Sequence, residues 1–214
     1  MPAVGSLLSF LAIDMSRGFA FKQCVVNQER AAMKVGTDGV LLGAWADILT
    51  DNTILDVGTG TGLIALMVAQ RNPEAKITAI EPQEGAWMDA KENFAASPWR
   101  DRLRLCRQAM QQFVEQEDGY YDHIVCNPPF FNDSLRCPDY GRSVARHSDT
   151  LDFDDLIACS ARLLRDNGRL SLIIPTDRYN DLMRSAGAVF HLSRCTEVMT
   201  KKSAVSKRML IELS

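Results

Sequence analysis

The tetrapeptide Asn127-Pro128-Pro129-Phe130 directly follows an apolar run, Tyr121–Cys126, and offers groups that could activate a planar amine. Such an amine is a poor nucleophile because its lone pair is delocalised into the ring. The side-chain carbonyl of Asn127 and the backbone carbonyl of Pro128 could accept its two N–H groups and aim the lone pair at an electrophile. Pro129 would stiffen the loop, and Phe130 would offer a ring on which a flipped-out base stacks. We predict that these four residues are catalytic, in methyl transfer to a planar nitrogen. The alternative is a proline-rich turn that ends a strand, with Phe130 in the core.

A glycine-rich turn upstream indicates which cofactor could supply the methyl group. Its glycines are Gly58, Gly60 and Gly62, and they follow Asp56 at the end of an apolar run. The dinucleotide fingerprint would place its third glycine at position 63, which is Leu63. Asp56 would also repel a pyrophosphate docked on the next helix, whereas a ligand with a sulfonium and an ammonium group suffers no such penalty. Asp56 and the three glycines therefore predict a site for S-adenosylmethionine, in preference to NAD.

A second acid, Glu81, ends the next apolar run and is followed by Pro82, which turns the chain. A carboxylate at this position can accept from both ribose hydroxyls through its two oxygens. A lone acid is more often a solvated surface residue, but the pairing with Asp56 around the glycine turn favours a ribose ligand. Glu81 and Pro82 therefore join the predicted cofactor site.

The glycine turn lies within a regular alternation of apolar β-type runs and helix-type segments. The predicted strands are residues 54–57, 77–81, 103–106, 121–126, 169–174, 189–198 and 208–213. The predicted helices are residues 63–70, 84–96, 110–117, 153–164 and 178–187, and the pairs Asn72-Pro73, Ser97-Pro98 and Asn167-Gly168 are predicted to end the first, second and fourth. Strict alternation predicts an α/β, Rossmann-like fold with a seven-stranded, mostly parallel sheet and helices on both faces. Only a short polar segment separates the last two runs, so the last strand is expected to be reversed.

The residues before this alternation are predicted to form an N-terminal extension and a cofactor-covering segment, 1–48, ahead of a methyltransferase domain at 49–214. Residues 19–26 could form a short hairpin or an extended lid, and Thr37 could N-cap a helix that runs to Ala46. The apolar stretch 7–13 has no preceding Lys or Arg and no cleavage site, so no signal peptide is expected. No run approaches the roughly 18 apolar residues of a membrane span, and we expect a soluble, cytoplasmic protein.

The composition agrees with one globular domain. The chain has 214 residues, of which 46% are apolar and 24% charged, and this is ordinary for a single well-buried domain, for which we expect a monomer. The six cysteines form no Cys-x-x-Cys pair and have no histidine cluster beside them, which argues against a metal site and a disulfide framework. The net charge of -3 gives no overall attraction to nucleic acid, so RNA binding would depend on local basic patches.

Two blocks before the glycine turn resemble the bacterial tRNA1(Val) (adenine-37-N6)-methyltransferases. They are Phe21-Lys22-Gln23 and Ala32-Met33-Lys34-Val35-Gly36-Thr37-Asp38-Gly39-Val40-Leu41-Leu42-Gly43-Ala44-Trp45. The second block is far more specific than the glycine turn, which all class I methyltransferases share. The resemblance runs from about residue 19 to residue 213 and includes the Asn-Pro-Pro-aromatic motif. It implies a class I fold and transfer of a methyl group from S-adenosylmethionine to N6 of an adenine in tRNA, just 3′ of the anticodon.

The resemblance also implies further cofactor contacts. They are Lys34, Gly36, Thr37, Asp38, Gln108 and Asn127. In such enzymes the segment that matches residues 34–38 lies against the methionine end of the cofactor; otherwise Thr37 is only a helix cap and Lys34 a surface charge. Relatives often carry an acid near the adenine of the cofactor where this chain has Ala109, so the adenine contact is expected either to be weaker or to move to Gln108.

Basic side chains could form a rim around the mouth of the active site and bind RNA. They are Arg136, Arg142 and Arg146 in the long polar segment 131–150, with Lys201, Lys202, Lys207 and Arg208 before the last strand. The alternative is that they are ordinary solvated charges.

Two other interpretations of the whole chain stay open. The same tetrapeptide serves methyl transfer to other planar nitrogens, such as protein glutamine or N2 of guanine in ribosomal RNA. A non-catalytic module that binds S-adenosylmethionine or RNA is favoured by Ala109 and opposed by the intact Asn127 and Phe130.

Overall fold

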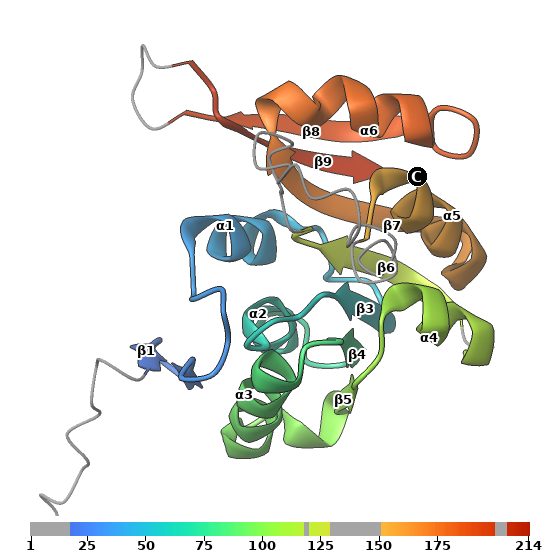
Figure 1. The fold of residues 1–214 in the computed structure, drawn as a ribbon. Helices are drawn as coiled ribbons and strands as arrows, with labels where there is room; N and C mark the ends of the chain where they lie inside the picture. Colours follow the sequence, from blue (N-terminus) through green and yellow to red (C-terminus); the bar gives the residue numbers. More distant parts are fainter. Residues whose placement is uncertain (1–17, 118–119, 129–150, 200–204) are drawn as a thin grey trace, which may run out of the picture.

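The computed structural model describes residues 18–117, 120–128, 151–199 and 205–214. A seven-stranded sheet crosses the molecule (Figure 1), with the strand order β5-β4-β3-β6-β7-β9-β8. The strands are β3 (Thr53–Val57), β4 (Lys76–Ile80), β5 (Leu103–Cys106), β6 (Tyr121–Cys126), β7 (Leu164–Pro175), β8 (Leu192–Val198) and β9 (Arg208–Leu213). The pairs among β3 to β7 are parallel, and β9 is antiparallel to both of its neighbours. The predicted mostly parallel sheet with a reversed last strand is confirmed.

Helices cover both faces of this sheet. They are α1 (Thr37–Trp45), α2 (Leu63–Arg71), α3 (Glu84–Ala96), α4 (Met110–Gln116), α5 (Phe153–Leu163) and α6 (Tyr179–Ala186). Neighbouring residues of a strand point to opposite faces, so Ile124 packs into a core with α4, α5 and α6, while Val125 packs into a second core with α1, α2 and α3. Within the described part of the chain, no helix has the length and apolar character to cross a membrane.

The N-terminal segment forms the predicted hairpin, but the start of α1 differs from the prediction. Strand β1 (Gly18–Ala20) pairs antiparallel with β2 (Val25–Asn27). Thr37 is the first helical residue of α1, and the N-cap is Gly36 in an extended conformation. The prediction that Thr37 caps this helix was therefore wrong by one position.

The fourth predicted helix ends earlier than the Asn167-Gly168 pair. Helix α5 stops at Leu163, and strand β7 begins at Leu164, where that residue pairs with Tyr121 of β6. Asn167 has a φ of 64° and kinks the start of β7. The left-handed turn that this pair favours is thus present, but it lies within strand β7. The residues on both sides of the turn, Leu164 and Arg169, pair with β6, and the register shifts between them.

A buried polar cluster ties two central strands together. His123 of β6 contacts Asp51 Oδ2 through Nδ1 at 2.9 Å and Ser171 Oγ of β7 through Nε2 at 2.8 Å. Arg169 donates to the second oxygen of Asp51 at 2.8 Å. His123 and Ser171 are fully buried, so this Asp-His-Ser arrangement is closed to substrates and holds the sheet together.

Candidate active site

Strand register gathers the predicted site residues at one edge of the sheet. Val57 of β3 pairs with both Ile80 of β4 and Cys126 of β6, and Ile80 pairs with Cys106 of β5. Because these parallel strands end in register, the residues that follow them emerge next to one another. The strand order also reverses between β3 and β6, and in open α/β sheets ligands bind in the crevice at such a point.

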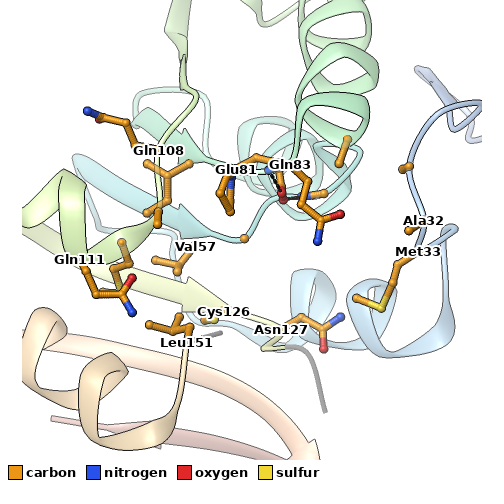
Figure 2. Close-up of a pocket in the computed structure, with 18 residues that line it drawn as sticks. Ala32, Met33, Val57, Glu81, Gln83, Gln108, Gln111, Cys126, Asn127 and Leu151 are labelled. Atoms are coloured by element: carbon orange, nitrogen blue, oxygen red, sulfur yellow. Dashed lines mark hydrogen bonds between the residues drawn. The ribbon is translucent and has the colours of Figure 1, made fainter. Parts of the chain in front are cut away.

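A cavity of about 330 Å³ lies at this edge, within the size range of small-molecule sites. Figure 2 shows Glu81 near its middle. Gln108, Gln111 and Leu151 lie toward one end, and Met33 lies toward the other, on the same side as Asn127. The cavity therefore joins the ends of β3, β4 and β6 to the N-terminal segment and to residue 151, at the start of α5.

Glu81 presents both carboxylate oxygens in a fixed orientation. Its Oε2 accepts the N–H of Gly60 at 2.9 Å, and its Oε1 accepts the N–H of Gln83 at 2.9 Å. Burial raises the pKa of this carboxyl, and the two backbone hydrogen bonds act in the opposite direction. Each oxygen keeps a further lone pair, so the carboxylate can accept from two neighbouring hydroxyl groups, as on a ribose.

The glycine turn has the backbone that its three glycines allow. Gly58, Gly60 and Gly62 have φ values of 67°, 59° and 85°, a region that side chains strongly disfavour. Gly58 and Gly60 line the cavity. Gly62 is instead the N-cap of α2, and a Cβ there would lie 2.5 Å from a ring carbon of Phe94. Gly62 thus packs closely against Phe94 of α3, and its predicted contact with the cofactor stays a prediction.

Asp56, which is predicted to bind the cofactor, is not among the residues that line the cavity. Its carboxylate is fully buried, and Oδ2 accepts from the Thr59 hydroxyl at 2.5 Å and from the N–H of Ala65 at 3.0 Å. Side chains alternate along a strand, so Val57 is the residue of β3 that faces the cavity, and Asp56 turns toward the start of α2. Asp56 holds the glycine turn against this helix and can act on a ligand only through that turn.

The predicted contacts at positions 34 to 38 are also absent from the cavity wall, which instead includes the three residues just before them. The Lys34 ammonium donates to backbone carbonyls of the preceding turn. Gly36 and Thr37 begin helix α1, and Asp38 accepts from Arg208 of β9 at 2.7 Å. The Lys34 and Asp38 side chains thus bond within the protein, and the predicted cofactor contacts of the four residues stay predictions.

Asn127 and Pro128 begin immediately after β6, and Asn127 lines the cavity as predicted from its position. The predicted catalytic residues Pro129 and Phe130 lie outside the described residues. Gln108 lines the cavity, and its amide donates to Gln116 at 2.6 Å.

The predicted basic rim is described only in part. Lys207 is exposed, whereas Arg208 forms the ion pair with Asp38 described above. The other five predicted RNA contacts, Arg136, Arg142, Arg146, Lys201 and Lys202, lie outside the described residues. The RNA-binding role of the rim stays a prediction.

Sequence reasoning did not identify several residues of the cavity wall. Ala31, Gln83 and Leu151 belong to no sequence motif. A single apolar or polar loop residue does not show from the sequence whether it lines a cavity. Gln111 lies one helical turn beyond the strand end, and its amide donates to Asp155 of α5 at 2.9 Å. Among the described residues, no group of three or more His, Cys, Asp or Glu side chains could hold a metal ion.

Comparison with known proteins identifies the family. Residues 33–201 match the family described as methyltransferase small domain. A curated tRNA1(Val) (adenine(37)-N6)-methyltransferase from Bacteroides thetaiotaomicron is 49% identical over 196 residues, which cover 90% of this chain and 81% of that protein. A protein of the same name from Phocaeicola vulgatus is 49% identical over 194 residues, 90% of this chain and 82% of that protein. The crystal structure of a predicted O-methyltransferase from Agrobacterium tumefaciens shares the fold, with a TM-score of 0.66, 21% identity, and coverage of 83% of this chain and 80% of that one. This chain belongs to the methyltransferase small domain family and to the tRNA1(Val) (adenine(37)-N6)-methyltransferases.

Proposed function

We propose that this protein is an enzyme that transfers the methyl group of S-adenosylmethionine to N6 of adenine 37 in tRNA1(Val). One observation carries the proposal: Asn127 shares a cavity wall with the glycine turn and Glu81. A group that can hold an exocyclic amine and a group that can hold a ribose thus face the same space. The names of the relatives add the acceptor, an adenine of a tRNA.

The cofactor fits this cavity in one direction. Glu81 would accept from its two ribose hydroxyls, Gln108 and Gln111 would hold the adenine, and the N-terminal segment at Met33 would hold the methionine. The bound cofactor supplies an electrophilic methyl group on a sulfonium. Because Asn127 lies on the methionine side of Glu81 in Figure 2, an amine held there can face this methyl group.

Asn127 and Pro128 prepare the acceptor. The Asn127 side-chain oxygen and the Pro128 backbone oxygen accept the two hydrogens of the adenine amine and aim its lone pair at the methyl carbon. When bound, the sulfonium would give up its methyl group to this amine as the S–C bond breaks, and the methylated amine would release a proton to water. No general base is needed, because the cationic product amine is strongly acidic. In this proposal Phe130 stacks on the flipped base, and Pro129 stiffens the loop.

Gln111 can contact the cofactor adenine together with the predicted Gln108, beside Ala109, where the resemblance leads us to expect an acid. Its N–H bond to Asp155 commits one donor to the protein and orients the amide, so that its oxygen can accept from the amine of the cofactor adenine. Ala109 and Met110 supply apolar wall beside it. The binding site for the cofactor adenine therefore uses an amide oxygen in place of a carboxylate.

The proposed setting follows from the substrate. A tRNA acceptor requires a protein in the cytoplasm, and we propose that it acts there as a monomer. Lys207 and the rim residues outside the described part of the chain neutralise phosphates of the tRNA, so activity falls as salt rises.

An unmodified transcript of tRNA1(Val) tests the proposal. Incubation with labelled S-adenosylmethionine, followed by nucleoside analysis, should give N6-methyladenosine, and a transcript with guanosine at position 37 should give no product. Equal labelling of both transcripts would refute the assignment of the base. Labelling of protein or ribosomal RNA in a cell extract, without labelling of the tRNA, would favour another planar nitrogen. Cofactor binding without any transfer would favour the non-catalytic module.

A further inference from the structure

Helix α3 carries two buried polar side chains that face the N-terminal segment. Asp89 is fully buried, and Asn93 is 1% exposed. They are four residues apart and therefore lie on the same face of the helix. Burial of polar groups is costly unless each finds partners, so their partners identify what this face holds in place.

The Asp89 carboxylate holds the chain just before the cavity wall. Its Oδ2 accepts the backbone N–H groups of Arg30 at 2.9 Å and Ala31 at 2.8 Å. Its Oδ1 accepts from the Arg30 guanidinium at 3.0 Å. Ala31 is itself a wall residue, followed by Ala32 and Met33 (Figure 2). One carboxylate thus fixes the backbone at the point where the N-terminal segment enters the cavity.

Asn93 connects the same segment to the glycine turn. Its Oδ1 accepts the N–H of Asn27 at 2.7 Å, and its Nδ2 donates to the carbonyl of Asn27 at 2.9 Å. The Nδ2 also donates to the carbonyl of Thr61, within the glycine turn, at 2.8 Å. A single amide therefore ties the N-terminal segment to the glycine turn.

The backbone of the segment also lies unusually close to α3. A Cβ added to Gly85 would lie 2.8 Å from the carbonyl oxygen of Arg30, closer than real Cβ atoms come to backbone. Glycine at this position lets the segment approach the helix, so the position of residues 27–33 depends on a snug contact as well as on hydrogen bonds.

We propose that Asp89 and Asn93 are positioning residues for the cofactor. They hold residues 27–33, the covering segment, as one wall of the cavity, although neither side chain lines it. The inference rests on the proposed binding of S-adenosylmethionine in this cavity. Without these bonds the wall separates from the glycine turn, and the cofactor loses contacts on the methionine side while the catalytic residues stay in place.

The substitution Gly85→Ala tests this with the hydrogen-bonding groups intact. A Cβ at this position would lie 2.8 Å from the Arg30 carbonyl oxygen, so the covering segment must shift away from α3, and the unliganded variant should melt lower than the wild type. The dissociation constant for S-adenosylhomocysteine, from isothermal titration calorimetry, should rise about tenfold or more. A kcat at saturating cofactor within about twofold of the wild type, together with this weaker binding, is a result that a general packing defect would not give.

Asp89→Asn and Asn93→Leu test the hydrogen bonds themselves. Each should raise the KM for S-adenosylmethionine about tenfold, as expected for the loss of one or two hydrogen bonds, with kcat at saturating cofactor and the KM for tRNA within about twofold of the wild type. Trypsin should cut after Arg30 faster in both variants. Glu92→Gln is the matched control, because Glu92 is exposed on the same helix and, among the described residues, contacts this segment through the Arg30 side chain alone, at 3.0 Å.

Glu81→Gln, measured in parallel, separates this inference from the proposed function. If Glu81→Gln weakens binding but Gly85→Ala, Asp89→Asn and Asn93→Leu all bind S-adenosylhomocysteine as the wild type does, the positioning role is wrong and the cofactor site stands. If Glu81→Gln also binds normally, the cofactor lies elsewhere, and both proposals fail. If Asp89→Asn does not fold, Gly85→Ala alone decides.

Discussion

Replacing Asp56 by asparagine should make the protein more stable at alkaline pH. The carboxylate is fully buried next to the glycine turn, and its Oδ1 has no hydrogen-bond partner among the described residues. Burial raises its pKa from 3.8 to about 7, the bonds from Thr59 and Ala65 act against this, and the charge of Glu81 adds to it. Above that pH the folded protein must hold an unsatisfied negative charge away from water.

The size and sign of the effect follow from this pKa. Because the folded state binds the proton more tightly than the unfolded state, stability is lost as pH rises from about 4 to about 7. The difference between 3.8 and about 7 corresponds to about 4 kcal/mol. Asparagine cannot ionise, and its side-chain oxygen can still accept from Thr59 and Ala65. Asp56→Asn should therefore approach wild-type stability near pH 5 and exceed it by a few kcal/mol near pH 8.5.

Urea unfolding of both proteins at pH 5 and at pH 8.5 measures this difference in stability directly. The free energies of unfolding are compared with the same dependence on urea concentration for wild type and variant. Asp101→Asn is the control, because the Asp101 side chain is 92% exposed and its removal should leave the pH dependence unchanged. If Asp56→Asn is destabilised equally at both pH values, the buried carboxylate is not the source of the pH dependence, and the reasoning fails.

Three further substitutions probe the cavity and the glycine turn beside it. Glu81→Gln should weaken the binding of S-adenosylhomocysteine by about 10- to 100-fold, because a charged acceptor is lost. The affinity of the wild type should fall as pH drops through the raised pKa of Glu81, because only the ionised carboxyl accepts from both hydroxyls. An affinity that does not change with pH would contradict this. Asn127→Ala should lower the methyl-transfer rate by about 10²- to 10³-fold in single-turnover assays. Its affinity for S-adenosylhomocysteine should stay within about threefold of the wild-type affinity. A normal rate of transfer would remove Asn127 from the mechanism. Gly62→Ala should lower the free energy of unfolding by about 1–3 kcal/mol in denaturant titrations, because alanine is strained at a φ of 85° and its methyl group meets Phe94. An unchanged free energy of unfolding would mean that the turn can shift at no cost.

The order and type of the elements from residue 53 onward could be predicted from the sequence. Apolar runs and turn residues are local signals, and Tyr121–Cys126, Leu103–Cys106 and Glu84–Ala96 have the predicted bounds. The Asn167-Gly168 pair shows where local signals fail. Its left-handed turn was expected, but whether it ends a helix or bends a strand depends on the pairing of Leu164 with β6.

The residues of the candidate site divide in the same way. Glu81 and Asn127 could be found because each directly follows an apolar run, and parallel strands in register bring such positions to one edge. Asp56 has an equally clear motif, yet the alternation of side chains along β3 turns it away from the cavity.

The sequence by itself determined the succession of strands and helices, the glycine turn and the Asn-Pro-Pro-Phe motif, because these depend on neighbouring residues. Only the tertiary structure decided which segment closes the cofactor cavity. Asp89 and Asn93 meet partners 59 and 66 residues away, and nothing in their own surroundings marks them. Such contacts are set by the packing of α3 and the N-terminal segment, where burial obliges each polar group to find a partner from a distant part of the chain.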